Sequence, residues 1–210
     1  MRHYPLASAA LLVLLSGPVE GAAEPSLAGL VEKSDWAAVK ALGPTVLPEL
    51  AGLYAAGDES RRSQIASLYY YLGWQSPAAK AVLLRDIHTE NVDLRINVQY
   101  ALGRVSSDEE VVDGLLANMR HDPDPLIRDK AACALAYDQI HLSERQKVRL
   151  FAGLIAALED REPQVRGIAI LALQIHTGQR KGFVASAPPG LRAEAIECWR
   201  AWLSEYQAQQ

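Results

Sequence analysis

Residues 122–135 read DPDPLIRDKAACAL, and this stretch decides the fold of the chain. Its acidic turn ends at Asp124-Pro125. Asp124 is a good helix N-cap. Pro125 suits the first helical position because the backbone N–H that proline lacks would have no partner inside the helix there. Arg128 follows, and Ala134-Leu135 comes six and seven positions after it. The stretch therefore predicts a turn between two helices, with an arginine in the first turn of the second helix.

Two other segments repeat this spacing. They are Val92-Asp93-Leu94-Arg95 with Ala101-Leu102, and Pro163-Gln164-Val165-Arg166 with Ala172-Leu173. From Arg95 to Arg128 is 33 residues and from Arg128 to Arg166 is 38, inside the period of roughly 20–50 residues that marks stacked repeats. A weaker copy begins at Arg62, but Leu68-Tyr69 stands where Ala-Leu is expected, which leaves its register open. The repetition predicts an all-α protein, an α-helical solenoid of stacked helix pairs.

Helix start and stop signals divide the chain into these pairs. Among them are Ser76 before Pro77, which predicts a capped helix start, and Ser143-Glu144-Arg145-Gln146, which predicts a capping box. We expect helices at 44–56 with 59–73, 77–88 with 92–104, 108–120 with 125–138, and 143–160 with 163–177. Gly73, Gly103 and Gly178 are predicted to end helices in the left-handed conformation, which glycine adopts without strain.

Both ends of such a stack need a cover for their apolar faces. We expect a helix at 34–42, capped by Ser34, at one end and a helix at about 190–206 at the other. Trp199 and Trp202 lie in the second of these, where they are more typical of a cap than of a ligand cage.

The turn at 122–125 and the similar turn at 159–163, each followed by an apolar residue and arginine, resemble those of HEAT-type and HEAT-like repeats of secreted bacterial proteins. The resemblance extends over about residues 44–177. It implies a right-handed α-α superhelix of about four helix pairs with terminal capping helices. On this basis the chain divides into a signal peptide (1–23), an N-terminal linker and capping helix (24–43), HEAT-like repeats (44–178), and a loop with a C-terminal capping helix (179–210).

The resemblance also implies a ladder of ion pairs, in which an aspartate of a turn and the arginine of the next helix join adjacent repeats. The residues available for it are Asp93, Arg95, Asp124, Arg128, Asp160 and Arg166. Such pairs fix the register of packed helices more often than they perform chemistry, so we interpret these residues as structural.

The N-terminus has the pattern of a secretory signal peptide. Arg2 precedes an apolar run at residues 6–15, and the small residues Gly21-Ala22-Ala23 follow Pro18. The run is too short to span a bilayer, and we expect cleavage after Ala23. A retained membrane anchor is the alternative, although the run breaks at residues 16–18. The prediction is an exported protein, periplasmic or extracellular, with no membrane span after cleavage.

The charge balance argues against nucleic acid as a partner. The chain has 21 Lys and Arg against 25 Asp and Glu, a net charge of −4, and nucleic-acid binders instead concentrate positive charge on one face. We therefore expect a protein or peptide partner and no nucleic acid. We also expect the chain to be a monomer.

The helical period of about 100° per residue sorts the second helix of each pair into two faces. Positions three, six, seven and ten after the repeated arginine form the predicted core. Positions two, five and nine point the other way, toward the concave side that solenoids use for binding. They hold Asn97, Tyr100 and Arg104 in one repeat and Lys130, Cys133 and Tyr137 in the next. A mixture of Tyr, Arg and amide side chains suits a protein partner, and an ordinary solvated face is the open alternative.

The third repeat breaks the pattern, because the same positions hold Ile168, Leu171 and Ile175. Three apolar residues on an outward face need a cover. We expect the loop at 179–189 or the C-terminal helix to fold over them.

No residues with the spacing of a catalytic or metal site stand out. His121, His141 and His176 lie at turns or helix ends of different repeats, without a nucleophile elbow. The turn His121-Asp122-Pro123-Asp124 does not have a recognised ligand spacing. We assign no catalytic, cofactor-binding or metal-binding residue and predict a non-catalytic interaction or scaffold module of the cell envelope. The alternatives are a HEAT-like enzyme or enzyme accessory, of lyase or base-excision type, and a spacer without a ligand.

Cys133 and Cys198 are the two cysteines of the chain. A disulfide requires their Cα atoms to lie within about 7 Å, which needs the C-terminal helix to fold back along the groove. The sequence leaves open whether they are free thiols.

Overall fold

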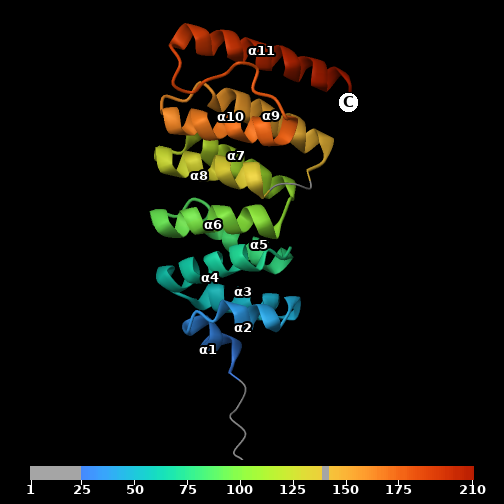
Figure 1. Cartoon of the computed structure of the whole chain (residues 1–210). Coiled ribbons are helices and arrows are strands. Elements are labelled where there is room, and N and C mark those ends of the chain that lie inside the picture. Colours follow the sequence, from blue (N-terminus) through green and yellow to red (C-terminus); the bar gives the residue numbers. More distant parts are fainter. Residues whose placement is uncertain (1–24, 139–141) are drawn as a thin grey trace, which may run out of the picture.

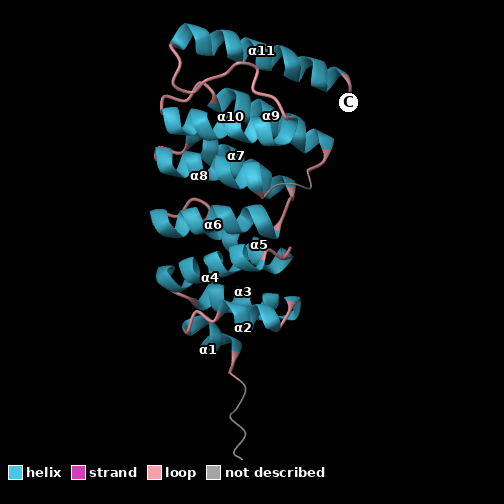
Figure 2. Ribbon diagram, in the orientation of Figure 1, coloured by secondary structure: helices cyan, strands magenta, loops and turns pink. Residues whose placement is uncertain are grey.

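A computed structural model describes residues 25–138 and 142–210. The expected signal peptide at 1–23 lies outside these residues. The described part of the chain is helical, with turns and no β-strand (Figure 2), so the predicted all-α class is confirmed. Its α-helices are α1 (Leu27–Glu32), α2 (Trp36–Ala41), α3 (Leu47–Ala56), α4 (Glu59–Leu72), α5 (Pro77–Leu83), α6 (Val92–Val105), α7 (Glu109–His121), α8 (Pro125–Tyr137), α9 (Glu144–Ala157), α10 (Pro163–Thr177) and α11 (Pro189–Ala208). Short 3-10 turns at Pro44–Val46 and Leu84–Asp86 adjoin α3 and α5.

The helices pack in pairs that follow one another along the chain (Figure 1). The pairs are α3 with α4, α5 with α6, α7 with α8, and α9 with α10. The second helices of the pairs, α4, α6, α8 and α10, each contact the next, and we call them the second-helix layer. On the other side α3 contacts α5, α7 contacts α9, and α9 contacts α11.

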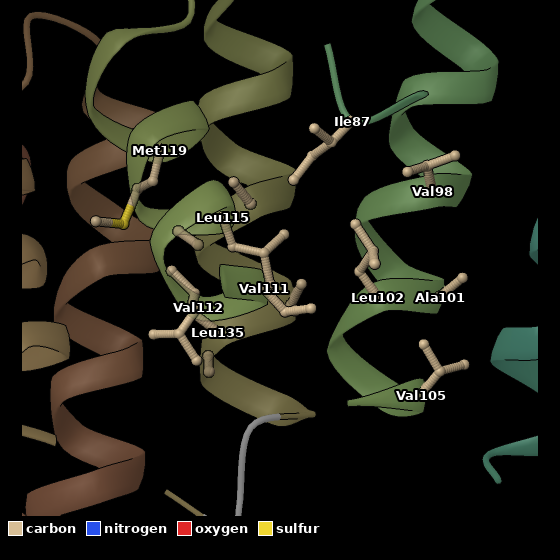
Figure 3. Close-up of a cluster of buried hydrophobic side chains, with 14 of the residues drawn as sticks. Ile87, Val98, Ala101, Leu102, Val105, Val111, Val112, Leu115, Met119 and Leu135 are labelled. Carbon is tan, nitrogen blue, oxygen red and sulfur yellow. The ribbon is translucent and has the colours of Figure 1, made fainter. Parts of the chain in front are cut away.

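The core lies between these helices and follows the predicted period. Val98, Ala101, Leu102 and Val105, which are three, six, seven and ten positions after Arg95, are all buried. Figure 3 shows them on α6, opposite the buried side chains of α7 and α8. The face of α6 that the sequence assigned to the core is therefore the buried one.

The structure also settles the register of the first repeat. Leu68 and Tyr69, six and seven positions after Arg62, are fully buried on α4. Arg62 therefore occupies the position that Arg95 has in the next pair. A tyrosine fits where the other repeats have leucine because its hydroxyl reaches the backbone oxygen of Leu47, 3.4 Å away.

Most of the predicted helix ends are confirmed. The Ser76 hydroxyl accepts a hydrogen bond from the Ala79 N–H at 3.0 Å, and Ser143 forms a capping box with Gln146. Gly73 and Gly178 end α4 and α10 with φ of 69° and 73°.

The prediction for Gly103 was wrong, because this residue lies inside α6 rather than after it. A Cβ atom at this position would lie 3.0 Å from Cβ of Asp138 and 3.4 Å from Cβ of Ala134. The glycine is therefore needed for the close approach of α6 to the end of α8, not for a left-handed turn.

The N-terminal end differs from the single helix expected at 34–42. Two short helices, α1 and α2, form there. Asp35 rather than Ser34 caps α2, since its carboxylate accepts from the Ala38 N–H at 3.1 Å. Ser34 instead makes the turn between the two helices with a positive φ of 55°.

An arginine ladder joins successive pairs. It consists of Arg62 with Asp86 (Nη1 to Oδ1, 3.0 Å), Arg95 with Asp122 (Nη1 to Oδ2, 3.2 Å), and Arg128 with Asp160 (Nε to Oδ2, 2.7 Å). Each of these three arginines lies on the second-helix layer and reaches the turn aspartate of the following pair. Every one of these aspartates is at or just past the end of the first helix of its pair.

The partners differ from those expected. Asp93 is exposed at the start of α6, and within the described residues it is not the partner of any ladder arginine. Asp124 caps α8 by accepting from the Leu126 N–H at 2.8 Å. The carboxylate of Asp160 pairs with Arg128, one repeat earlier, whereas Arg166 donates to the backbone carbonyl of Asp160 at 2.6 Å. The arginine side chains extend along the stack toward the following pair, so the nearest carboxylate is not the one beside them in the sequence.

Arg166 ends the ladder on a backbone oxygen. Its Nε and Nη2 donate to the carbonyl of Ala185 at 3.0 and 2.8 Å. Ala185 belongs to the loop between α10 and α11, where Phe183 is buried. The loop therefore takes the place of a further turn at this end of the stack.

The C-terminal helix covers α9 rather than the apolar face of α10. Trp199 is fully buried, and the rings of Trp202 and Tyr206 lie 5.2 and 5.4 Å from the Phe151 ring of α9. The expected cover of α10 is incomplete. Ile168 is buried and Leu171 half-buried, but Ile175 remains 44% exposed.

Candidate functional site

Three consecutive tyrosines of α4 lie in different environments. Tyr69 is fully buried, Tyr70 is half-buried, and Tyr71 is 40% exposed. Each residue of a helix is turned by about 100° from the one before it, so the run passes from the core to the surface of the second-helix layer. Of the three tyrosines, only Tyr69 packs wholly in the core.

An aromatic pocket of about 410 Å³ opens on the second-helix layer between α2, α4 and α6. Its lining residues are Trp36, Ser67, Tyr70, Tyr71, Asn97, Tyr100 and Arg104. Asn97, Tyr100 and Arg104 are three of the residues that the sequence assigned to the groove.

The rings of the aromatic pocket form two pairs. Trp36 of α2 and Tyr71 of α4 have ring centroids 5.5 Å apart. Tyr70 of α4 and Tyr100 of α6 have the same separation. In each pair the ring planes meet at 49°. Each pair therefore spans two neighbouring helices of the stack and presents tilted rings rather than a flat surface.

Arg104 fixes one side of the pocket. Its Nε donates to Oδ1 of Asp138 at 2.7 Å, and its Nη2 donates to the Tyr70 hydroxyl at 3.2 Å. The guanidinium carbon lies 4.2 Å from the centroid of the Tyr70 ring, within the range of a cation–π contact. Burial raises the pKa of Asp138, and the hydrogen bond from Arg104 opposes that effect. Arg104 is thus held in place by a buried carboxyl group and a ring at once.

A second pocket of about 350 Å³ adjoins Arg104 on the side of α8. Its lining residues are Gly73, Gln75, Gly103, Arg104, Ser106, Ser107, Tyr137 and Asp138. Tyr137, another predicted groove residue, is 54% exposed there. Arg104 therefore connects the aromatic pocket with the surface around Tyr137.

Lys130, like Cys133, lines neither pocket. Its ammonium group lies 2.8 Å from Oδ2 of Asp129 on the same helix. Cys133 is half-buried on α8, next to the side chain of Tyr100. Cys133 and Cys198 are both free thiols in this structure.

Several pocket residues were missed in the sequence. Counted from Arg62, positions five and nine are Ser67 and Tyr71, and both line the aromatic pocket. The same rule that selected Tyr100 and Arg104 would have found them if the register at Arg62 had been known. Trp36 belongs to no repeat, so the repeat pattern holds no signal for it.

Metal clusters and membrane-spanning helices are absent from the part of the chain that the structure describes. In residues 25–138 and 142–210, no three His, Cys, Asp or Glu side chains lie together in a way that could hold a metal ion. Over the same residues, no helix combines the length and the apolar character needed to cross a bilayer. His141 lies outside them.

A scan against protein-family models finds no match for the chain, and a search of curated proteins finds none either.

Proposed function

We propose that the chain is a HEAT-like repeat protein, a right-handed α-α superhelix that serves as a non-catalytic interaction or scaffold module of the cell envelope. Two features support the repeat architecture. Arginines recur at positions 62, 95, 128 and 166, and three of them reach a turn aspartate of the following pair. The second helices pack in chain order as one layer.

The observation that carries the binding role is the aromatic pocket. Tyr70, Tyr71, Tyr100 and Trp36 gather with Arg104 on the same side of the second-helix layer. Tyr, Trp and Arg are the residue types that contribute most of the binding energy at protein interfaces. A core position would bury these rings completely, whereas here each keeps part of its surface open to solvent. The pocket is thus suited to a side chain of a partner protein.

The place of action rests on the N-terminal sequence. The apolar run at residues 6–15 and the small residues at 21–23 are typical of export. A partner would then be met in the periplasm or outside the cell.

Cross-linking and co-purification from the native envelope test the proposal. We expect the variant Tyr100→Ala/Arg104→Ala/Tyr137→Ala to lose its captured partner. A matched control, Glu110→Ala/Arg145→Ala/Leu191→Ala, changes exposed residues away from the groove and keeps the partner. Undiminished capture by the groove variant would contradict the assignment.

Removal of Arg104 leaves the buried Asp138 without its cation, which can unfold a protein. The double variant Tyr100→Ala/Tyr137→Ala keeps that ion pair and is the second test. Its circular dichroism spectrum and melting curve show whether a loss of capture comes from the groove or from unfolding.

A further inference from the structure

We propose that the aromatic pocket binds a proline-rich segment in the polyproline II conformation, and that this segment runs along the stack with one turn for each helix of the second-helix layer. The inference rests on the proposed binding function and names the chemistry of the partner.

A line of exposed side chains extends the pocket along the stack. The ninth residues after the four repeated arginines are Tyr71, Arg104, Tyr137 and Ile175, one on each of α4, α6, α8 and α10. We call these four residues the groove stripe. Tyr71, Tyr137 and Ile175 are 40%, 54% and 44% exposed and belong to the few large apolar side chains that the described surface leaves open. The fourth, Arg104, lies over the ring of Tyr70.

The spacing of the groove stripe matches one kind of peptide. Packed helices lie about 8–10 Å apart, so successive stripe residues are separated by roughly that distance. A polyproline II helix rises about 3.1 Å per residue with three residues per turn, or about 9 Å per turn. Every third residue of such a peptide would therefore face a new helix. An extended β-strand, with a side-chain period of about 6.6–6.8 Å on one face, does not keep this step.

The ring pairs suit a prolyl side chain. The ring planes meet at 49° in both the Trp36–Tyr71 pair and the Tyr70–Tyr100 pair. The first pair joins α2 to α4 and the second joins α4 to α6, so the two pairs follow one another along the stack. Proline-rich ligands dock in aromatic-lined grooves, where the rings contact the pyrrolidine groups and little ordering entropy is lost. Two ring pairs on two steps would hold two prolines of one segment, three residues apart.

The charges at the pocket argue against a cationic ligand. Nζ of Lys40 lies 5.1 Å from the Tyr71 ring centroid, and Cζ of Arg104 lies 4.2 Å from that of Tyr70. Two ring faces that could attract a cation thus already carry one. The residues that line the aromatic pocket include no carboxylate, so none of them supplies a counter-charge for an ammonium group. An uncharged, apolar ligand avoids this repulsion.

The hydrogen-bonding groups also favour a proline-rich backbone. Prolyl residues offer carbonyl acceptors and no N–H donors, so they require donors from the protein. The Tyr70 hydroxyl accepts from Arg104 and keeps its own proton to donate. A sugar has hydroxyl donors that need acceptors as well, and the lining offers them only the neutral oxygens of serine, asparagine and tyrosine side chains.

Fluorescence anisotropy with the full chain and labelled peptides tests the inference. One peptide repeats Pro-Ala-Ala, and a second has the same composition with its prolines grouped at one end. We expect the periodic peptide to bind at least about tenfold more tightly. Tyr71→Ala and Tyr137→Ala should each weaken its binding at least about fivefold, because each removes an exposed ring from the stripe.

Leu191→Ala is the matched control, since Leu191 is 59% exposed but lies on α11. Its affinity for the periodic peptide should be unchanged. Equal binding of the two peptides would overturn the inference, as would unchanged binding by Tyr71→Ala. Binding of soluble oligosaccharides at the same rings, with no binding of either peptide, would overturn it in favour of a glycan ligand.

These outcomes are distinguishable from failure of the proposed function. If neither peptide binds while Tyr100→Ala/Tyr137→Ala still loses its envelope partner, the groove is a binding site and only the proline-rich ligand is wrong. If capture is also undiminished, both proposals fail.

Discussion

The guanidinium of Arg128 holds the carboxylate of Asp160 through two hydrogen bonds, Nε to Oδ2 at 2.7 Å and Nη2 to Oδ1 at 3.0 Å. The third nitrogen, Nη1, donates to the carbonyls of Asp122 and Pro123 in the turn before α8. One arginine therefore ties its own turn to the turn of the next pair. Bidentate pairs of this kind combine strength with a fixed geometry, so the ladder sets how far each pair is displaced from the last.

Asp160→Asn should destabilise the protein by about 3 kcal/mol, because it leaves the buried Arg128 guanidinium without its counter-charge. The measurement is urea unfolding followed by circular dichroism. Asp93→Asn is the control, since Asp93 is exposed and lies outside the ladder. We expect a change within about 0.5 kcal/mol for that variant. Equal effects of the two substitutions would contradict a structural role for the ladder.

The same pair predicts an acid dependence. Burial acts to raise the pKa of Asp160, but hydrogen bonds from Arg128 and from the Glu162 N–H outweigh it, so this pKa lies below its usual value of 3.8. A carboxyl whose pKa is lowered by folding adds stability above its unfolded pKa and loses it as the pH falls through the folded pKa. Unfolding free energies measured between about pH 6 and pH 3 should therefore fall less steeply in Asp160→Asn than in the native chain.

Tyr54→Phe should lower the free energy of unfolding by about 1.5–3 kcal/mol, because the Tyr54 hydroxyl donates to a charged acceptor in the core. That acceptor is Oδ2 of Asp86, 2.6 Å away, and the same carboxylate pairs with Arg62. Tyr69→Phe provides the comparison, since the bond from Tyr69 to the Leu47 carbonyl is 3.4 Å long and neutral. Its cost should be about 1 kcal/mol or less. Denaturant unfolding of both variants checks the order, and a larger loss from Tyr69→Phe would refute it.

His176 should make the fold less stable in mild acid. Burial lowers the pKa of this imidazole below its usual 6.5, with a further contribution from Lys147, while a hydrogen bond to the Leu135 carbonyl at 3.1 Å opposes the shift. The unfolded chain then binds a proton more readily than the folded one, so stability rises with pH across this window and is lost as the pH falls below 6.5. Melting temperatures between about pH 7.5 and pH 5.5 should show it. His176→Gln keeps a donor but does not titrate, so its curve should be flatter.

The two thiols should react at different rates. Cys198 is exposed on α11, whereas Cys133 is half-buried beside Tyr100. Burial raises the pKa of the Cys133 thiol, which reduces the thiolate that reacts with alkylating reagents. Mass spectrometry without reductant should find two alkylated cysteines, with Cys198 modified first. A disulfide between them, or faster reaction of Cys133, would contradict the placement of α8 and α11.

The sequence was most informative where a local pattern carries the structure. The apolar residues after Arg95, Arg128 and Arg166 repeat with the helical period, and this predicted the core face of α6 before any packing was known. The helix starts at Ser76 and Ser143 followed from the preference of helix N-termini for hydroxyl caps. Three of the seven residues that line the aromatic pocket, Asn97, Tyr100 and Arg104, are predicted by the same periodicity.

The sequence was least informative where a residue meets a partner from another repeat. Gly103 looks like a helix end, yet it allows α6 to approach α8. Asp93 and Asp124 stand beside the ladder arginines in the chain, yet the arginines extend to the next pair. Trp36 completes the pocket from a helix outside the repeats.

The sequence by itself determined the class of fold, the positions of most helices and the face that each second helix buries, because these depend on side chains within a few residues of one another. Only the tertiary structure decided which aspartate each arginine meets, that the loop carrying Ala185 ends the ladder, and that Trp36 and Tyr71 share one pocket. Those relations depend on how far one helix pair is displaced and turned relative to the next. That displacement is set by the packing of many side chains at once, so no short stretch of the sequence predicts it.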